Sequence, residues 1–153
     1  MKKQFLPLLT AGLVAGALTA TAGIELQQVA SGFTSPMVLE PVTDGSGALL
    51  IADQPGTISV LGKNGKLRDQ LFLDLRPKMA KLNQGKFDER GLLGLALHPK
   101  FKSNRKFYIH YSAPLRDGGP NKWNHTAHIS EFKCAANALK ADLGTERVLL
   151  RID

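Results

Sequence analysis

The chain contains four histidines and one cysteine, the residue types that most often act as metal ligands, general bases or nucleophiles. His125 and His128 lie three residues apart, a spacing that points them to opposite faces of a strand. His110 falls on a different expected strand, and His98 belongs to a His-Pro turn, where packing or a backbone hydrogen bond is sufficient. These spacings do not match those of zinc sites. The sequence therefore predicts no metal site.

Cys134 is the only cysteine, so the fold cannot depend on an internal disulfide. It ends a strand-like segment, residues 129–134, and no recognisable base stands beside it. We predict a small buried side chain rather than a nucleophile.

Two aromatic residues, Tyr111 and Trp123, could form a surface on which a sugar ring stacks. Large aromatic side chains more often cover the edges of loops and strands, and we favour that interpretation. The long loop of residues 114–124 is suited to shaping a binding face, because loops on a rigid scaffold often carry function.

The N-terminus has the features of an export signal. Lys2 and Lys3 precede an uncharged run, residues 5–22, that ends in the small-x-small sequence Ala20-Thr21-Ala22. A transmembrane anchor is the alternative, but a proline, two glycines and several threonines interrupt the run, which is marginal for spanning ~30 Å of hydrocarbon. We expect residues 1–22 to be a signal peptide. The mature domain, residues 23–153, would then be periplasmic or secreted, with no stable membrane insertion.

The charge balance is basic, with 20 Lys and Arg against 13 Asp and Glu and a net charge of +7. Loss of Lys2 and Lys3 with the signal peptide would leave +5. A basic balance can indicate nucleic acid or a membrane surface. Here the basic residues are scattered among acidic ones and form no stripe with aromatic residues, so we predict no nucleic-acid partner.

The remaining sequence alternates short apolar runs with Gly, Asn, Asp and Pro, which is typical of strands and tight turns. It shows no long helical periodicity. A short helix is compatible with residues 76–82, and residues 84–90 are expected to form a loop. The first expected set of strands is 37–41, 48–53, 57–61 and 71–75. The second is 94–98, 106–112, 126–134 and 147–152, separated by residues 99–105, 113–124 and 135–145.

The last three strands of each set can be aligned in order, which predicts an internal repeat. Repeated four-stranded units in an all-β chain favour propeller blades, and a β-sandwich is the alternative. Propellers close with about 4–8 blades. Two blades leave apolar faces uncovered, so we expect residues 23–153 to be the N-terminal part of a larger propeller and not to fold stably alone. Packing as a small sandwich or assembly of several copies are the alternatives.

The most specific segment is Asp88-Glu89-Arg90-Gly91-Leu92-Leu93-Gly94-Leu95-Ala96-Leu97-His98-Pro99. It resembles the signature of the glucose/sorbosone dehydrogenase family, which includes aldose sugar dehydrogenases and the propeller of hedgehog-interacting-like proteins. Residues 29–36 resemble the family's opening strand. Residues 52–58 resemble its first-blade turn, where many members have a Glu-Arg or similar pair. Residues 146–150 resemble the strand before its catalytic segment.

The resemblance implies a six-bladed β-propeller of the soluble quinoprotein glucose dehydrogenase type, of which about two blades are present. It implies pyrroloquinoline quinone (PQQ) on the propeller axis, Ca²⁺ nearby, and oxidation of an aldose at C1 to a lactone with transfer of electrons to an acceptor. In such chemistry a base removes a proton while hydride passes to the cofactor.

The resemblance also assigns roles to the motif. Glu89 matches a polar position beside the substrate and cofactor; a loop carboxylate paired with Arg90 is the alternative. Arg90, Gly91, Gly94, His98 and Pro99 are expected to be structural, with the two glycines allowing close backbone packing. The family's catalytic His, its cofactor-binding Arg and Lys, and its Ca²⁺ ligands would lie beyond Asp153. A non-catalytic secreted propeller that binds a protein or glycan, or an inactive truncated product, is the alternative to an enzyme.

Overall fold

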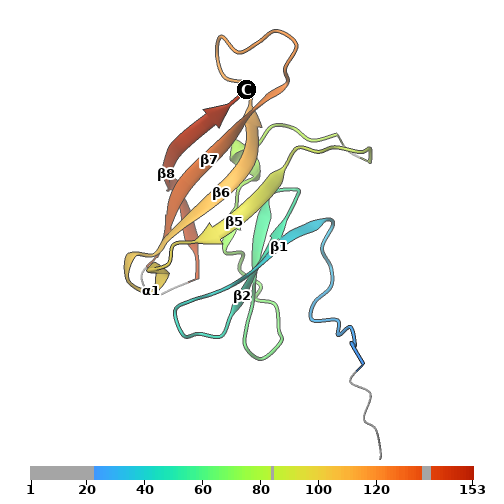
Figure 1. Ribbon diagram of the computed structural model, residues 1–153, viewed down its shortest axis with the longest axis vertical. Coiled ribbons are helices and arrows are strands. Elements are labelled where there is room, and N and C mark those ends of the chain that lie inside the picture. The colour runs from blue at the N-terminus through green and yellow to red at the C-terminus, as the bar shows by residue number, and fades with distance from the viewer. Residues whose placement is uncertain (1–22, 84, 136–138) are drawn as a thin grey trace, which may run out of the picture.

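The two sets of strands form two antiparallel sheets of four strands each, as the sequence predicted (Figure 1). The computed structural model describes residues 23–83, 85–135 and 139–153. The predicted signal peptide, residues 1–22, lies outside them. Sheet A contains β1 (Pro36–Pro41), β2 (Leu49–Asp53), β3 (Thr57–Leu61) and β4 (Leu73–Asp74). Sheet B contains β5 (Leu92–Leu97), β6 (Lys106–Pro114), β7 (His125–Cys134) and β8 (Ala141–Ile152).

Each sheet is a meander, because consecutive strands are hydrogen-bonded neighbours in the order in which they occur in the chain. Tight turns with a glycine at positive φ join the strands of sheet A, at Gly45 and Gly47, at Gly56 and at Gly65. Only a residue without a Cβ adopts this conformation readily. The repeat predicted from the sequence is therefore a repeat of structure, since β2, β3 and β4 correspond in order to β6, β7 and β8.

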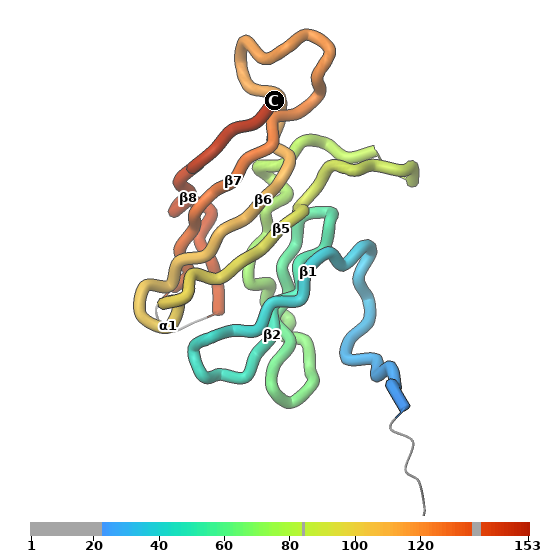
Figure 2. Tube along the Cα trace, viewed as in Figure 1, coloured from blue at the N-terminus to red at the C-terminus, as the bar shows by residue number. Residues whose placement is uncertain are grey.

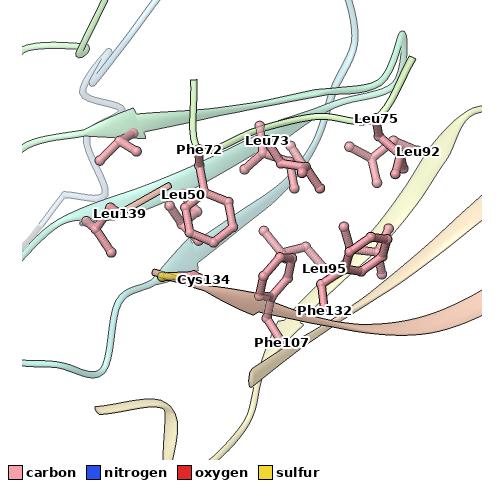
Figure 3. Close-up of a cluster of buried hydrophobic side chains, with 14 of the residues drawn as sticks. Leu50, Phe72, Leu73, Leu75, Leu92, Leu95, Phe107, Phe132, Cys134 and Leu139 are labelled. Atoms are coloured by element: carbon pink, nitrogen blue, oxygen red, sulfur yellow. The ribbon is translucent and has the colours of Figure 1, made fainter. Parts of the chain in front are cut away.

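The two sheets pack face to face around one apolar core (Figures 1 and 3). Phe107 of β6 is fully buried, and the centre of its ring lies 4.9 Å from that of Phe72. Phe72 directly precedes β4 of sheet A. On its own sheet Phe107 stacks on Phe132 at 5.6 Å. Sheet A contributes Leu50 and Ile58, both without exposed surface. This arrangement fixes the position of one sheet against the other.

The outer faces of the two sheets carry exposed apolar side chains. Met37 and Leu39 of β1 are 47% and 52% exposed, and Leu150 and Ile152 of β8 are 49% and 48% exposed. An apolar face of this kind is normally covered by another element of structure. The expectation that this chain alone is unstable stays a prediction.

Several predicted boundaries were wrong. β8 begins at Ala141, inside the segment 135–145 expected to separate strands. The expected strand 71–75 forms ladder pairs only at Leu73–Asp74. The helix-compatible segment 76–82 contains only the 3₁₀ turn η1 (Arg76–Lys78), and a short helix, α1 (Phe101–Asn104), lies in the expected separator 99–105. β5 begins at Leu92, two residues before the predicted start.

Candidate functional site

The loop that carries Glu89 connects sheet A to sheet B (Figure 2). The backbone at both of its ends is hydrogen-bonded to one residue of β6, Ser112. The carbonyl oxygen of Ser112 accepts a hydrogen bond of 2.8 Å from the backbone N–H of Ala80. The N–H of Ser112 donates to the carbonyl oxygen of Gly91 at 2.9 Å. Residues 81–90, hereafter the connecting loop, therefore leave and rejoin the fold at the same point.

Asp88 and Arg90 brace the C-terminal half of the connecting loop. The Arg90 guanidinium donates to Asp88 Oδ1 at 2.9 Å and to Oδ2 at 2.7 Å. These hydrogen bonds hold the pKa of the Asp88 carboxyl far below its ordinary value. Asp88 Oδ2 also accepts the N–H of Asn83 at 2.8 Å, across the loop. The alternative in which Arg90 neutralises Glu89 is not what the structure shows, because Arg90 pairs with Asp88.

Glu89 lies between these two paired residues and is exposed. Within residues 23–83, 85–135 and 139–153 it takes part in no hydrogen bond or ion pair. Its carboxylate is therefore available to accept hydrogen bonds from a ligand's hydroxyl groups.

Gln54, in the turn between β2 and β3, contacts the connecting loop on both sides of Glu89. Its side-chain Nε2 donates to the carbonyl oxygens of Asp88 and Arg90, at 2.7 and 2.8 Å. Its own carbonyl oxygen accepts the N–H of Leu92 at 2.9 Å. The sequence marked this turn by its Pro and Gly and by its resemblance to the family's first-blade turn. No local pattern signalled contacts with residues more than thirty positions away.

Asp53 positions Gln54. The buried Asp53 carboxylate accepts the backbone N–H groups of Thr34 and Ser35 at 2.9 and 2.6 Å. The N–H of Gln54 donates to the carbonyl oxygen of Ser35 at 2.9 Å. The turn is thereby tied to the segment that leads into β1.

The two motif glycines lie where neighbouring chain comes close. Gly91 is buried at φ +141°, and a Cβ at this position would lie 2.6 Å from both Cγ and the carbonyl oxygen of Gln54. A Cβ on Gly94 would lie 3.1 Å from the Cβ of His110 on β6.

His98 and Pro99 form the turn between β5 and α1. His98 Nδ1 accepts the N–H of Lys100 at 2.9 Å, and the carbonyl oxygen of His98 accepts the N–H of Phe101 at 2.7 Å. The ring of His98 lies 6.3 Å from that of Tyr108. The His98 side chain is thus engaged in the turn.

A cleft of about 750 Å³ lies beside the connecting loop. Its size is in the range of small-molecule sites. Its lining includes the cations Arg76, Lys81 and Lys86, and it includes Asp88 but not Glu89. Arg76 is paired with Asp74 by hydrogen bonds of 2.8 and 2.5 Å.

A second polar group lies at the interface of the sheets, around Glu146 of β8. Glu146 Oε1 accepts hydrogen bonds from the hydroxyls of Tyr111 and Ser130 at 2.7 and 2.8 Å, and Oε2 pairs with Lys78 Nζ at 2.8 Å. Burial opposes ionisation of Glu146, but these partners outweigh it and lower its pKa. His128 Nδ1 lies 3.2 Å from the Tyr111 hydroxyl. The network joins sheet B to the turn that follows sheet A.

In this network the Tyr111 hydroxyl contacts Glu146 and His128, which gives Tyr111 a structural role. Burial raises the pKa of its hydroxyl, and the side chain is only 2% exposed, so it cannot stack on a sugar at the surface. Trp123 is 50% exposed in the loop between β6 and β7. The sugar-stacking surface that was the less favoured alternative is therefore not formed by these two residues.

Among the residues that the structure describes, Cys134, His125 and His128 do not come together in a site. Cys134 is buried, and burial raises the pKa of its thiol, which disfavours the nucleophilic thiolate. His125 and His128 occupy different faces of β7, since their cross-strand partners are Pro114 and Tyr111. In the described parts of the chain no three His, Cys, Asp or Glu side chains are grouped as a metal site would require.

Comparison with known protein families gives a match over most of the chain. A family model described as glucose/sorbosone dehydrogenase matches residues 33–151. Human Hedgehog-interacting protein is 31% identical over 128 residues, which is 83% of this chain and 18% of that protein. The HIPL2 protein of Arabidopsis thaliana is 30% identical over 130 residues, 80% of this chain and again 18% of the relative.

Solved structures of sugar dehydrogenases are similar to this chain in fold. A protein from Thermus thermophilus, described as an oxidoreductase (glucose dehydrogenase), is similar with a TM-score of 0.61 and 26% identity. The match covers 84% of this chain and 32% of that one. The PQQ-bound aldose sugar dehydrogenase of Streptomyces coelicolor has a TM-score of 0.59 and 21% identity, covering 82% of this chain and 33% of that one. The chain thus spans about a third of these structures.

Proposed function

Because the chain belongs to the glucose/sorbosone dehydrogenase family, we propose that it supplies two adjacent blades of a PQQ-dependent sugar dehydrogenase. In this proposal Glu89 accepts a hydrogen bond from a hydroxyl of the aldose. The observation that carries the proposal is the state of Glu89: an exposed carboxylate, without a partner among the described residues, held between the braced residues Asp88 and Arg90. A carboxylate on a backbone held in this way can accept a hydrogen bond from a sugar hydroxyl without first breaking an ion pair.

The described residues do not by themselves fit PQQ or Ca²⁺. PQQ carries several carboxylates and needs several cationic partners. Near the connecting loop, Arg90, Arg76 and Lys78 are each paired with a carboxylate of this chain, and among the described residues only Lys81 and Lys86 of the cleft stand without an ion pair. In the described ranges, every fully buried side-chain nitrogen or oxygen already has a hydrogen-bond partner. We therefore assign the chain one wall of the substrate site. Residues outside 23–153 would supply the cofactor site and the base.

A protein- or glycan-binding module without redox chemistry is the second candidate. It is favoured by the 31% identity to human Hedgehog-interacting protein. In that case Glu89 and the connecting loop would contact the partner's surface. The two candidates differ in whether the protein oxidises a sugar.

The proposed compartment is the periplasm or the cell exterior, on the basis of the signal peptide predicted in residues 1–22. Across the part of the chain that the structure describes, none of the helices has the length and apolar character needed to traverse a bilayer. The proposed partners are a sugar and an electron acceptor.

The test uses the protein expressed from its complete reading frame and incubated with PQQ and Ca²⁺. Oxidation of a panel of aldoses is followed by reduction of a dye. We expect activity, and we expect Glu89→Ala to lower kcat/KM by about 10- to 100-fold, the size of one charge-assisted hydrogen bond. Glu25→Gln, which removes an exposed carboxylate from the N-terminal segment, is the control. A protein that binds PQQ but oxidises no aldose would contradict the proposal. The binding module would then remain as the candidate function.

A further inference from the structure

We infer that Gln54 is a positioning residue that sets the place of Glu89, an inference that rests on the proposed function of Glu89. Gln54 belongs to the turn between β2 and β3 in sheet A, whereas Glu89 immediately precedes β5 of sheet B. The two residues are linked through the backbone on either side of Glu89.

The link consists of two hydrogen bonds from one amide group. The side-chain Nε2 of Gln54 lies 2.7 Å from the carbonyl oxygen of Asp88 and 2.8 Å from that of Arg90. An NH₂ group has two donors, and here each one is used on a different carbonyl. The residues directly before and after Glu89 are thus held by a single side chain, so the Glu89 backbone between them has little freedom to move.

Two further contacts hold Gln54 against the same segment. Its carbonyl oxygen accepts the N–H of Leu92, and Gly91 approaches so closely that a Cβ would lie 2.6 Å from Gln54 Cγ. The Gln54 side chain therefore packs directly against the Gly91 backbone.

The chemistry of this position requires a donor of this length. Glutamate has nearly the same shape but accepts only, so its oxygens would face two carbonyl oxygens. Methionine has the same reach and no donor, and would leave both carbonyls unpaired. An unpaired, half-buried carbonyl is costly, and the loop would shift until water reached it.

The other supports of the connecting loop cannot replace this one. Asp88 and Arg90 brace the loop internally, and Ser112 ties its ends to sheet B. Among the described residues, Gln54 is the side chain that hydrogen-bonds residues 88–90 to sheet A. The position of Glu89 therefore depends on contacts with both sheets. The contact with sheet A is made by the hydrogen bonds of Gln54.

The experiment is a double-mutant cycle in the complete protein loaded with PQQ and Ca²⁺, with kcat and KM measured on its preferred aldose. The variants are Gln54→Glu, Glu89→Ala and the two combined. Gln70→Glu, which makes the same change at an exposed glutamine, is the matched control. Circular dichroism verifies folding, and Gln54→Met replaces Gln54→Glu if the latter does not fold.

We expect Gln54→Glu to lower kcat/KM by about 10-fold or more, since small misplacements of a positioned group have effects of that size. The combined variant should be no worse than Glu89→Ala alone, because a residue that acts through Glu89 has no effect without it. Gln70→Glu should match the parent protein. If the effects of the two single substitutions multiply instead, Gln54 acts independently of Glu89 and the inference is overturned.

Amide hydrogen exchange of the peptide that contains residues 85–92 separates this inference from the proposed function. Faster exchange in Gln54→Glu than in Gln70→Glu is expected, because the backbone around Glu89 is released. If the parent protein oxidises no aldose, the proposed function fails and the exchange result alone decides on Gln54. Unchanged exchange would overturn the positioning role.

Discussion

Replacement of Gly91 by alanine tests the close contact between the connecting loop and the turn of sheet A. Gly91 has φ +141°, a backbone conformation that costs a residue with a Cβ about 1–3 kcal/mol. The added Cβ would also lie 2.6 Å from Gln54 Cγ and from the Gln54 carbonyl oxygen. The carbonyl is backbone and cannot rotate away, so overpacking adds about 1–3 kcal/mol. We expect Gly91→Ala to lower the free energy of unfolding by about 2–6 kcal/mol.

The assay is urea unfolding of the complete protein followed by circular dichroism, with Gly118→Ala as the control. Gly118 also has positive φ, +70°, but a Cβ there would meet nothing within 4 Å. It therefore measures the backbone cost alone, about 1–2 kcal/mol. The reasoning predicts that Gly91→Ala loses clearly more than Gly118→Ala. Equal losses would refute the claim that residues 54 and 91 are in close contact.

Two further predictions concern the contact between the sheets. Phe107→Ala should lower the free energy of unfolding by about 3–5 kcal/mol, because its fully buried ring packs on Phe72 and Phe132; a loss below about 1 kcal/mol in urea unfolding would contradict the described core. Burial and nearby Arg151 lower the pKa of His128 below its ordinary 6.5, so the unfolded chain binds the proton more tightly. The free energy of unfolding should therefore fall as the pH drops below about 6.5. His128→Gln should reduce the difference between the urea midpoints at about pH 7 and about pH 5. An unchanged difference would count against His128 as the cause of this loss of stability.

The strand order was predictable because turn chemistry is local. Glycines at Gly45, Gly56 and Gly65 mark the reversals of sheet A, and in the structure each has positive φ. Between them the apolar residues alternate, as at Ile58 and Val60, both fully buried on the core face of β3. A short alternating pattern and a short glycine-containing turn can both be recognised without knowledge of the rest of the chain.

The errors occurred where pairing partners far along the chain decide the structure. Ala141 and Asp142 have no apolar alternation, yet they pair with Cys134 and Lys133 and so extend β8. Leu75 is fully buried but lies outside the ladder, because β4 forms only two pairs. Burial and strand pairing are separate properties, and a hydrophobic pattern reports only the first.

The candidate site shows the same division. Glu89 could be named as a candidate from its motif, because the run up to Pro99 is contiguous in sequence. Gln54 could not, because it is 34 and 36 residues from the carbonyl groups that it binds. Glu146 likewise joins Lys78, Tyr111 and Ser130 only after the sheets have packed.

The residues that position Glu89 are also residues that hold the two sheets together. Gln54 connects sheet A to residues 88–92, and Gly91 is packed against it; Ser112 anchors the other side of the same segment. A substitution at any of these positions should therefore change both the free energy of unfolding and the recognition of a ligand at Glu89. The Glu89 side chain is exposed and makes no such contact with the described residues, so its substitution should change recognition alone. Because of this difference, Glu89→Ala is the cleaner probe of function. For the same reason, the effect of a substitution at Gln54 has to be measured both with Glu89 present and with Glu89 replaced by alanine.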